Sequence, residues 1–423
     1  MVISPHLHKT KKGLQIVLAP DNSTEAVALL IVTRAGSRFE SDDLAGMSHF
    51  LEHMYFTGTT RRPSSNAIAK EIDALGAEFN AHPSEETVSY HIKSASEHLE
   101  KTIDIFSDML VNSRFDLKDI KKEKKVVVEE VKLHQDMPTS EVFDLFSEAL
   151  FAGTPLGKRV GGTIKTVGNF NREKLLENKK LLYSSNRTYI CVSGNFGKLS
   201  PGEVVKMVES KFDFSTSDFK DQQKLKLSAK KFHHQTKDTN QTNFVIGNFG
   251  PSYSAKDRLA TRLLTIILGG AMSSRLFQEI REKRGLAYDI RTSGQFFSDI
   301  GAIYTSGGVA NNKVGETLLE VINQYQKIKK DLSREEVEAA KSFMIGQTKI
   351  AFEDSLNLAE FYLNNLIFTG NIKTKEEVFA EVESITFDQV LSAAKKYLDE
   401  NNLTLALVGP EAAEKQVKRI IKT

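Results

Sequence analysis

The sequence has little cysteine, little net charge and no long apolar run. Its single cysteine, Cys191, cannot form an internal disulfide, which fits a reducing compartment. Lysine and arginine number 57 against 55 aspartate and glutamate residues, so the charge balance indicates neither nucleic acid nor an anionic membrane as a partner. Apolar residues nowhere continue for the ~20 positions that a membrane-spanning helix needs. Because the start of the chain also lacks a charged segment followed by an apolar core, we expect a cytoplasmic protein without a membrane anchor.

The length and composition are those of a globular protein with more than one domain. Hydrophobic residues make up 40% of the 423 positions and charged residues 26%, and a chain of this length predicts two or three domains. Residues 216–232 are rich in serine, aspartate, lysine and glutamine, which is typical of a linker. We therefore expect an N-terminal domain at 1–215 and a C-terminal domain at 233–423.

The order of predicted elements repeats in the two halves. A long helix predicted at 116–134 corresponds to one at 333–350, with an offset of 217 residues, and each follows an amphipathic helix and precedes another helix. A period of half the chain predicts two similarly folded α+β domains. Any two α+β domains look alike at this coarseness, so the repeat alone leaves duplication open.

The segment Ser48–Met54 carries the strongest chemical signal. His49 and His53 are four residues apart and fall on one face of a predicted helix, where both imidazoles can bind one metal ion. Two histidines at this spacing often bind nothing. Glu52, directly before His53, strengthens the signal, because a carboxylate beside a metal-activated water can act as a base. A catalytic zinc site needs a third protein ligand, which this segment does not supply.

The same segment resembles the motif of the pitrilysin/insulinase family of metallopeptidases, and within it the short bacterial branch related to the mitochondrial processing peptidase. The resemblance rests on the run Gly46-Met47-Ser48-His49-Phe50-Leu51-Glu52-His53-Met54, followed by Phe56-x-Gly58-Thr59. It implies a zinc endopeptidase that binds one Zn²⁺ per chain and hydrolyses extended peptides or unfolded segments. Its inverted order, His-x-x-Glu-His, is the inverzincin signature.

The resemblance also implies a third zinc ligand on a distant helix. Glu130, 77 positions after His53, corresponds to the family's glutamate ligand, and Glu129 is the rival. Glu123 lies two helical turns before Glu130 and corresponds to a carboxylate that orients a ligand. It could also be one more charge on a Lys/Glu-rich helix.

Substrate-binding residues are implied in both halves. Asn80 and Ala81 resemble the marker of an edge strand that pairs with the peptide backbone. The following turn, Pro83–Thr87, is one residue shorter than the family pattern, and we expect His82 to be a surface or subsite residue. In the second half, Arg281 and Tyr288 match a family pair that holds the substrate carbonyl and stabilises the developing oxyanion.

Three further positions bear on the second half. Arg284 is the alternative to Arg281 in the substrate-binding pair. Ser273 or Ser274 stands at the position equivalent to His49, and Gln347 at the position equivalent to Glu130. The second domain is therefore predicted to have kept the fold and lost the metal.

The architecture that the resemblance implies is α+β. Each of two homologous domains is expected to contain a mainly antiparallel sheet packed with helices, and together they form half of a chamber. We therefore expect a homodimer in which Arg281 and Tyr288 act in trans on the partner's zinc site. The alternatives are a non-catalytic core or assembly subunit of the same fold, and the active subunit of a heterodimeric processing peptidase.

Overall fold

The computed structural model describes residues 5–221 and 225–421, which form two compact units. Residues 222–224, inside the predicted linker, lie outside this description. The two units differ from the predicted contiguous domains at two segments. Residues 133–157 pack with the second unit, and residues 349–374 pack with the first. The first unit falls within 1–132, 158–223 and 349–374, and the second within 133–157, 224–348 and 375–423.

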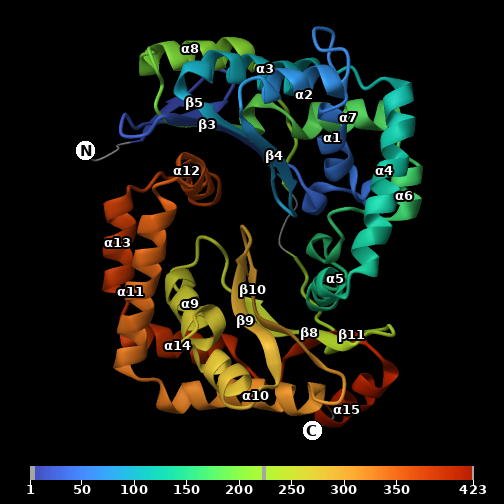
Figure 1. The fold of residues 1–423 in the computed structure, drawn as a ribbon, viewed down its shortest axis with the longest axis vertical. Helices are drawn as coiled ribbons and strands as arrows, with labels where there is room; N and C mark the ends of the chain where they lie inside the picture. The colour runs from blue at the N-terminus through green and yellow to red at the C-terminus, as the bar shows by residue number, and fades with distance from the viewer. Residues whose placement is uncertain (1–4, 222–224, 422–423) are drawn as a thin grey trace. The chain divides into compact units, whose positions relative to one another are not determined.

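The first unit contains a six-stranded mixed sheet (Figure 1). Its strand order is β1-β2-β6-β3-β5-β4, and every neighbouring pair is antiparallel except the parallel pair β2 and β6. β4 is an edge strand that pairs with β5 alone. The strands are β1 (His6–Lys9), β2 (Gln15–Pro20), β3 (Ala26–Thr33), β4 (Glu78–Pro83), β5 (Val88–Ala95) and β6 (Thr188–Gly194).

Burial along these strands follows from how helices cover the sheet. β3 is apolar up to its last residue, Thr33, and almost wholly buried, because α3 and α12 pack on it. β5 alternates buried and less buried residues, as expected for a strand with one well-covered face. The helices of this unit are α1 (Met47–Tyr55), α2 (Ser65–Asp73), α3 (Leu99–Asn112), most of α4 (Leu117–Asp136), α6 (Ile164–Gly168), α7 (Arg172–Leu182), α8 (Pro201–Lys211) and α12 (Ser355–Thr369).

The second unit repeats this strand order without the first strand. Its five-stranded sheet is ordered β7-β11-β8-β10-β9, with β7 and β11 parallel and the other pairs antiparallel. The parallel pair therefore has the same place in both sheets, which agrees with the predicted duplication. The strands are β7 (Phe232–Thr236), β8 (Gln241–Gly250), β9 (Ala287–Phe296), β10 (Gly301–Ala310) and β11 (Thr404–Gly409).

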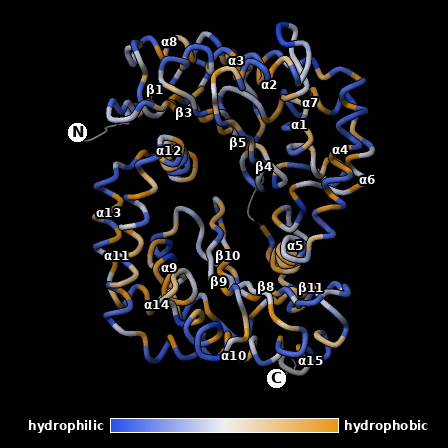
Figure 2. Tube along the Cα trace, in the orientation of Figure 1, coloured by the Kyte–Doolittle hydropathy of each residue, from blue (hydrophilic) through white to orange (hydrophobic). Residues whose placement is uncertain are grey.

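One helix from the opposite half of the sequence covers part of each sheet. α12 packs on β3 and β6 of the first unit, and α5 packs on β8 and β11 of the second. Hydrophobic residues recur along α5 (Figure 2) and form one buried cluster with the strands. That cluster includes Val142, Leu145, Phe146, Val245, Ala406 and Val408. Sequence order could not indicate this exchange, because the apolar face of a helix does not specify which sheet it meets.

The helices of the second unit include two π-helical segments. One π-helical segment spans Phe277–Glu282, and the other spans Ile266–Gly270. The α-helices are α5 (Pro138–Leu150), α9 (Arg258–Thr265), α10 (Val314–Asp331), α11 (Arg334–Ala351), α13 (Lys375–Ser384), α14 (Phe387–Tyr397) and α15 (Glu411–Ile421). Among the residues described, no helix has the length and apolar character needed to cross a membrane.

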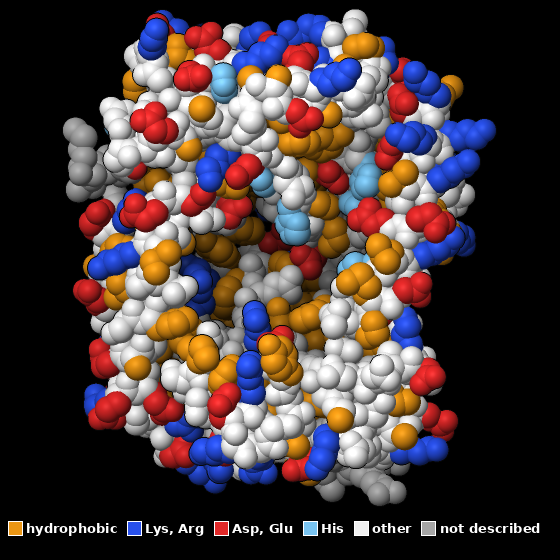
Figure 3. All heavy atoms as spheres, viewed as in Figure 1, with side chains coloured by type: hydrophobic (Ala, Val, Ile, Leu, Met, Phe, Trp, Pro, Cys, Tyr) orange, Lys and Arg blue, Asp and Glu red, His pale blue; other side chains and the backbone are white. Residues whose placement is uncertain are grey.

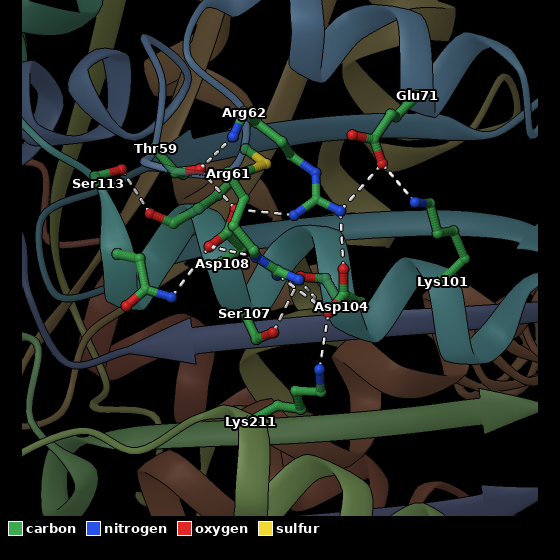
Figure 4. A network of polar contacts seen from close by, with 12 residues as sticks. Thr59, Arg61, Arg62, Glu71, Lys101, Asp104, Ser107, Asp108, Ser113 and Lys211 are labelled. Atoms are coloured by element: carbon green, nitrogen blue, oxygen red, sulfur yellow. Dashed lines mark hydrogen bonds and ion pairs between the residues drawn. The ribbon is translucent and has the colours of Figure 1, made fainter.

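A buried ionic network fixes the loop that follows α1 (Figure 4). Arg62 is 3% exposed, and its two terminal nitrogens donate to Asp108 Oδ2 at 2.8 Å, Asp104 Oδ2 at 2.8 Å and Glu71 Oε2 at 3.0 Å. Asp104 and Asp108 belong to α3 and Glu71 to α2. One guanidinium therefore ties the loop after α1 to two neighbouring helices.

Candidate active site

Helix α1 brings the two predicted histidines together. Met47, Phe50, Leu51 and Met54 are fully buried in the core, so the helix cannot rotate without exposing them. His49 and His53 share another face, and their Nε2 atoms converge to 3.2 Å. The imidazole rings lie nearly perpendicular, with centroids 4.8 Å apart. Histidine and acidic side chains gather over α1, α4 and β4 in Figure 3.

Glu130 on α4 approaches both imidazoles. Its Oε1 lies 3.4 Å from His49 Nε2, and its Oε2 lies 3.2 Å from His53 Nε2. Its contacts with the two histidines hold the pKa of Glu130 well below the ordinary value, so the carboxylate is ionised. The neighbouring Glu129 is different, because its carboxylate is exposed and accepts from Lys132 Nζ at 2.8 Å. Of the two rivals, only Glu130 lies against the histidine pair.

The donor set fits a zinc ion. Two nitrogen or oxygen atoms bound to one tetrahedral zinc at about 2.0–2.1 Å are roughly 3.3 Å apart. The Nε2 atoms of His49 and His53 are 3.2 Å apart, and each lies 3.2 to 3.4 Å from a different oxygen of the Glu130 carboxylate, which is close to the spacing of neighbouring donor atoms around such an ion. The Nδ1 atom of His49 is buried and has no hydrogen-bond partner among the described residues. Three converging donors leave a fourth position for water or substrate.

Glu123 supports His53 from the other side of the ring. Its Oε2 lies 3.5 Å from His53 Nδ1, and its side chain is largely buried. Burial by itself would lower the pKa of His53, but Glu123, Glu130 and Glu52 outweigh this effect and raise that pKa to about 10. The carboxylates therefore favour a cation at this place, and Glu123 lies where it can orient the His53 ring.

Glu52 also lies beside the histidine pair, but its pKa is shifted in the opposite direction from that of Glu130. Its Oε2 is 3.9 Å from His53 Nε2, and donor atoms of His49, Glu52 and His53 lie within 4.8 Å of one another. Burial raises the pKa of Glu52, although His53 and His49 oppose this effect. A carboxylate with a raised pKa is a stronger base, so Glu52 is suited to accept a proton while Glu130 stays ionised.

The predicted substrate strand lies at the free edge of the first sheet. Asn80 and Ala81 are in β4, where they pair with His91 and Tyr90 of β5 and leave the outer edge without a strand. The Asn80 side chain accepts from the Ala81 backbone N–H at 2.9 Å. His82 is exposed on the same strand. The edge is therefore accessible to an added strand.

Arg281 and Tyr288 meet in the second unit. The guanidinium carbon of Arg281 lies 4.6 Å from the centre of the Tyr288 ring and 4.7 Å from that of Phe277. Tyr288 is 79% exposed. Arg284, the alternative arginine, instead pairs with Glu320 at 3.0 Å. The stacking role of Phe277 was missed, because no local sequence rule predicts which ring an arginine will stack on.

The second unit has no equivalent metal site among its described residues. Ser274 is buried and Gln347 is exposed, and neither side chain is a usual zinc ligand. Another group of possible ligands, His134, Glu141 and Asp144, lies where α4 meets α5. There His134 Nδ1 is 3.4 Å from Asp144 Oδ2, and both carboxylates also have other interaction partners.

Comparisons with known proteins agree with this site and fold. Residues 15–164 match the family model described as Insulinase (Peptidase family M16), and residues 169–344 match the model described as Peptidase M16 inactive domain. The chain belongs to this peptidase family. An uncharacterized zinc protease of Rickettsia bellii (strain RML369-C) is 32% identical over 410 residues, covering 96% of this chain and 97% of the relative. The uncharacterized zinc protease YmxG of Bacillus subtilis (strain 168) is 31% identical over 405 residues, which cover 95% of this chain and 97% of that relative.

A solved structure extends the similarity to the whole fold. The crystal structure of a protease from Helicobacter pylori superposes with a TM-score of 0.87 at 19% identity, covering 97% of this chain and 100% of that one. At this identity the likeness concerns the fold alone. The predicted two-unit α+β architecture is confirmed.

Proposed function

We propose that the protein is a zinc-dependent endopeptidase that hydrolyses peptide bonds in extended peptides or unfolded segments. The observation that carries this proposal is the convergence of His49, His53 and Glu130 with Glu52 beside them. These three side chains would hold one zinc ion per chain, and the family relatives named zinc proteases support the same assignment.

Glu52 would carry out the proton transfers of the reaction. Zinc, when bound, polarises a carbonyl group and makes a water molecule more acidic. Glu52 accepts the proton of the attacking water and then delivers it to the leaving amine, which its raised pKa favours. Glu123 keeps the His53 ring oriented throughout, because it contacts the nitrogen that faces away from Glu130.

The free edge of β4 would bind the substrate as an additional strand. Main-chain hydrogen bonds along the outer edge of β4, made by the residues whose N–H and C=O groups point away from β5, would hold an extended peptide with little preference for its sequence. This mode suits a substrate that has no folded structure of its own. A folded domain has few free strands to offer and would be a poor substrate.

Two adjacent carboxylates on α4 provide a matched test of the metal site. We expect the purified wild-type chain to contain about one zinc ion, and to cleave peptides of a mixed library detected by mass spectrometry. Glu130→Gln should lose zinc and cleavage together, whereas Glu129→Gln should keep both, because Glu129 contacts Lys132. Zinc-free wild-type protein, or a Glu130→Gln variant that keeps its zinc, would contradict the assignment.

We further propose that the active enzyme is a closed homodimeric chamber. His49, His53 and Glu130 belong to the first unit, whereas Arg281 and Tyr288 belong to the second. In this arrangement, Arg281 and Tyr288 of one chain hold the substrate carbonyl and stabilise the oxyanion at the zinc site of the other. The exposure of Tyr288 supports the proposal, because the phenol is available to a group outside its own unit.

Mixing two inactive variants tests whether the pair acts in trans. Heterodimers of Glu52→Gln and Tyr288→Phe chains contain one intact site, so random exchange should restore about a quarter of wild-type activity. The control mixes Glu52→Gln with Glu130→Gln chains, whose changes both lie on the zinc side and should not complement. Verified Glu52→Gln/Tyr288→Phe heterodimers without activity would count against the trans arrangement. Activity only with a different partner chain would favour a heterodimeric enzyme.

A further inference from the structure

Helix α1 begins without a capping side chain of its own. Gly46 is the N-cap residue, with φ of 93°, and it has no side chain to accept from the first turn. Glycine is required here because its backbone is left-handed and a Cβ would lie 2.7 Å from the Gly161 carbonyl oxygen. The first backbone N–H groups of a helix have no partner within the helix. The helix that carries His49 and His53 therefore depends on another residue to satisfy its N-terminus.

Glu40 supplies two acceptors at this helix start. Its side chain reaches from the preceding loop, so that Oε2 accepts from the Gly46 N–H at 2.8 Å and Oε1 from the Ser48 N–H at 2.6 Å. Glu40 is 1% exposed. Burial raises the pKa of Glu40, and the hydrogen bonds from Ser48 and Gly46 oppose this effect. A buried carboxylate with two such donors is an effective cap and also interacts favourably with the positive end of the helix dipole.

The loop that holds Glu40 is itself fixed against a second segment of the first unit. Lys158 Nζ donates to the Glu40 carbonyl oxygen at 2.7 Å, and Thr166 Oγ1 donates to the Ala45 carbonyl oxygen at 2.7 Å. Gly161 lies next to the His49 ring, since a Cβ there would be in ordinary van der Waals contact with His49 Nδ1, at 3.7 Å. These contacts leave the first turn of α1 little freedom to move.

We propose that Glu40 is a positioning residue for the metal site. It fixes the first turn of α1 and thereby the ring of His49, which is the residue after Ser48. His53, one turn further along, is held by Glu123, whereas His49 Nδ1 has no such partner among the described residues. The position of His49 therefore depends on the backbone of the first turn, which Glu40 holds. This inference rests on the proposed zinc site.

The test compares two buried carboxylates of the first unit. Glu40→Gln keeps the size of the side chain but loses one acceptor and the charge, and we expect the dissociation constant for zinc, measured by chelator competition, to rise about tenfold. The cobalt-substituted variant should also show an altered visible spectrum, because the geometry at His49 changes. The control is Glu86→Gln, since Glu86 is 3% exposed and its carboxylate accepts from the Arg38 guanidinium at 2.8 Å. This control should lower the melting temperature while leaving zinc affinity and the cobalt spectrum unchanged.

Each outcome decides the proposal. If wild-type protein binds no zinc, the proposed function fails, and this inference fails with it. If wild-type binds zinc and folded Glu40→Gln binds it equally well, the positioning role alone is wrong. Equal zinc loss in Glu86→Gln would also overturn it, because the effect would then be general destabilisation. If Glu40→Gln does not fold, Glu40→Asp, which keeps the charge and shortens the reach, should show a smaller loss of zinc affinity, and unchanged affinity there would contradict the proposal.

Discussion

Replacing Glu52 by glutamine should reduce peptide cleavage by at least about 100-fold while zinc stays bound. Glutamine has nearly the same shape as glutamate but cannot accept a proton from water at neutral pH. The proposed ligands His49, His53 and Glu130 are unchanged, and Glu52 Oε2 lies 3.9 Å from His53 Nε2, so the ion should keep its site. The measurement is a cleavage rate on a peptide substrate together with the zinc content of the same preparation.

The zinc content separates two roles for Glu52. Its carboxylate is close enough to the histidines to be a metal ligand, since donor atoms of His49, Glu52 and His53 lie within 4.8 Å of one another. Loss of zinc in Glu52→Gln would make Glu52 a ligand and contradict its role as the base. Full activity with zinc bound would also contradict that role. Glu129→Gln is the control, because it makes the same chemical change on the surface beside the site.

Replacing Arg62 by methionine should lower the free energy of unfolding by about 3–5 kcal/mol, the cost of breaking a buried ion pair by removing one partner. Methionine keeps an unbranched apolar stem but leaves Asp104, Asp108 and Glu71 without the guanidinium they share. The loss of the guanidinium should cost most at Asp108, because this carboxylate is 1% exposed and water cannot replace the lost partner. Denaturant unfolding of the full chain at neutral pH measures the change.

Arg61 provides the matched control for this substitution. Arg61 also contacts Asp104 and Asp108, but its side chain is 51% exposed. Water screens an exposed pair, so Arg61→Met should cost less than about 1 kcal/mol. Equal losses in the two variants would show that burial does not set the strength of this network.

The same network should make the first unit sensitive to acid. Burial alone would raise the pKa values of these three carboxyl groups. The pKa values nevertheless lie below their ordinary values, because Asp104 accepts from Lys211, Arg62 and Arg61, Asp108 from Thr59, Asn112 and both arginines, and Glu71 from Lys101 and Arg62. A lowered carboxylate pKa stabilises the folded state above the unfolded pKa, and this contribution is lost as the pH falls. We therefore expect wild-type stability to decline below about pH 4, and Arg62→Met to decline less steeply there.

Local patterns were sufficient to predict the elements that carry the chemistry. The spacing of His49 and His53 predicted one helix face, and the structure has α1 at Met47–Tyr55 with both Nε2 atoms converging. The resemblance around Asn80 and Ala81 predicted an edge strand, and the structure has these residues in β4, which pairs with β5 at one edge of the sheet. The choice of Glu130 as the third ligand rested on the family resemblance, because spacing along one helix could not exclude Glu129.

What the sequence determined by itself was local: the helix with its two histidines, the adjacent base and the order of elements in two similar halves. These features depend on residues within a few turns of one another, so periodicity reveals them. Only the tertiary structure decided that Glu130 faces the histidines, that α5 and α12 cover the sheets of the opposite halves, and that Glu40 caps α1. Each of these depends on side chains brought together by packing across long stretches of chain, and no repeat in the sequence specifies such a pairing.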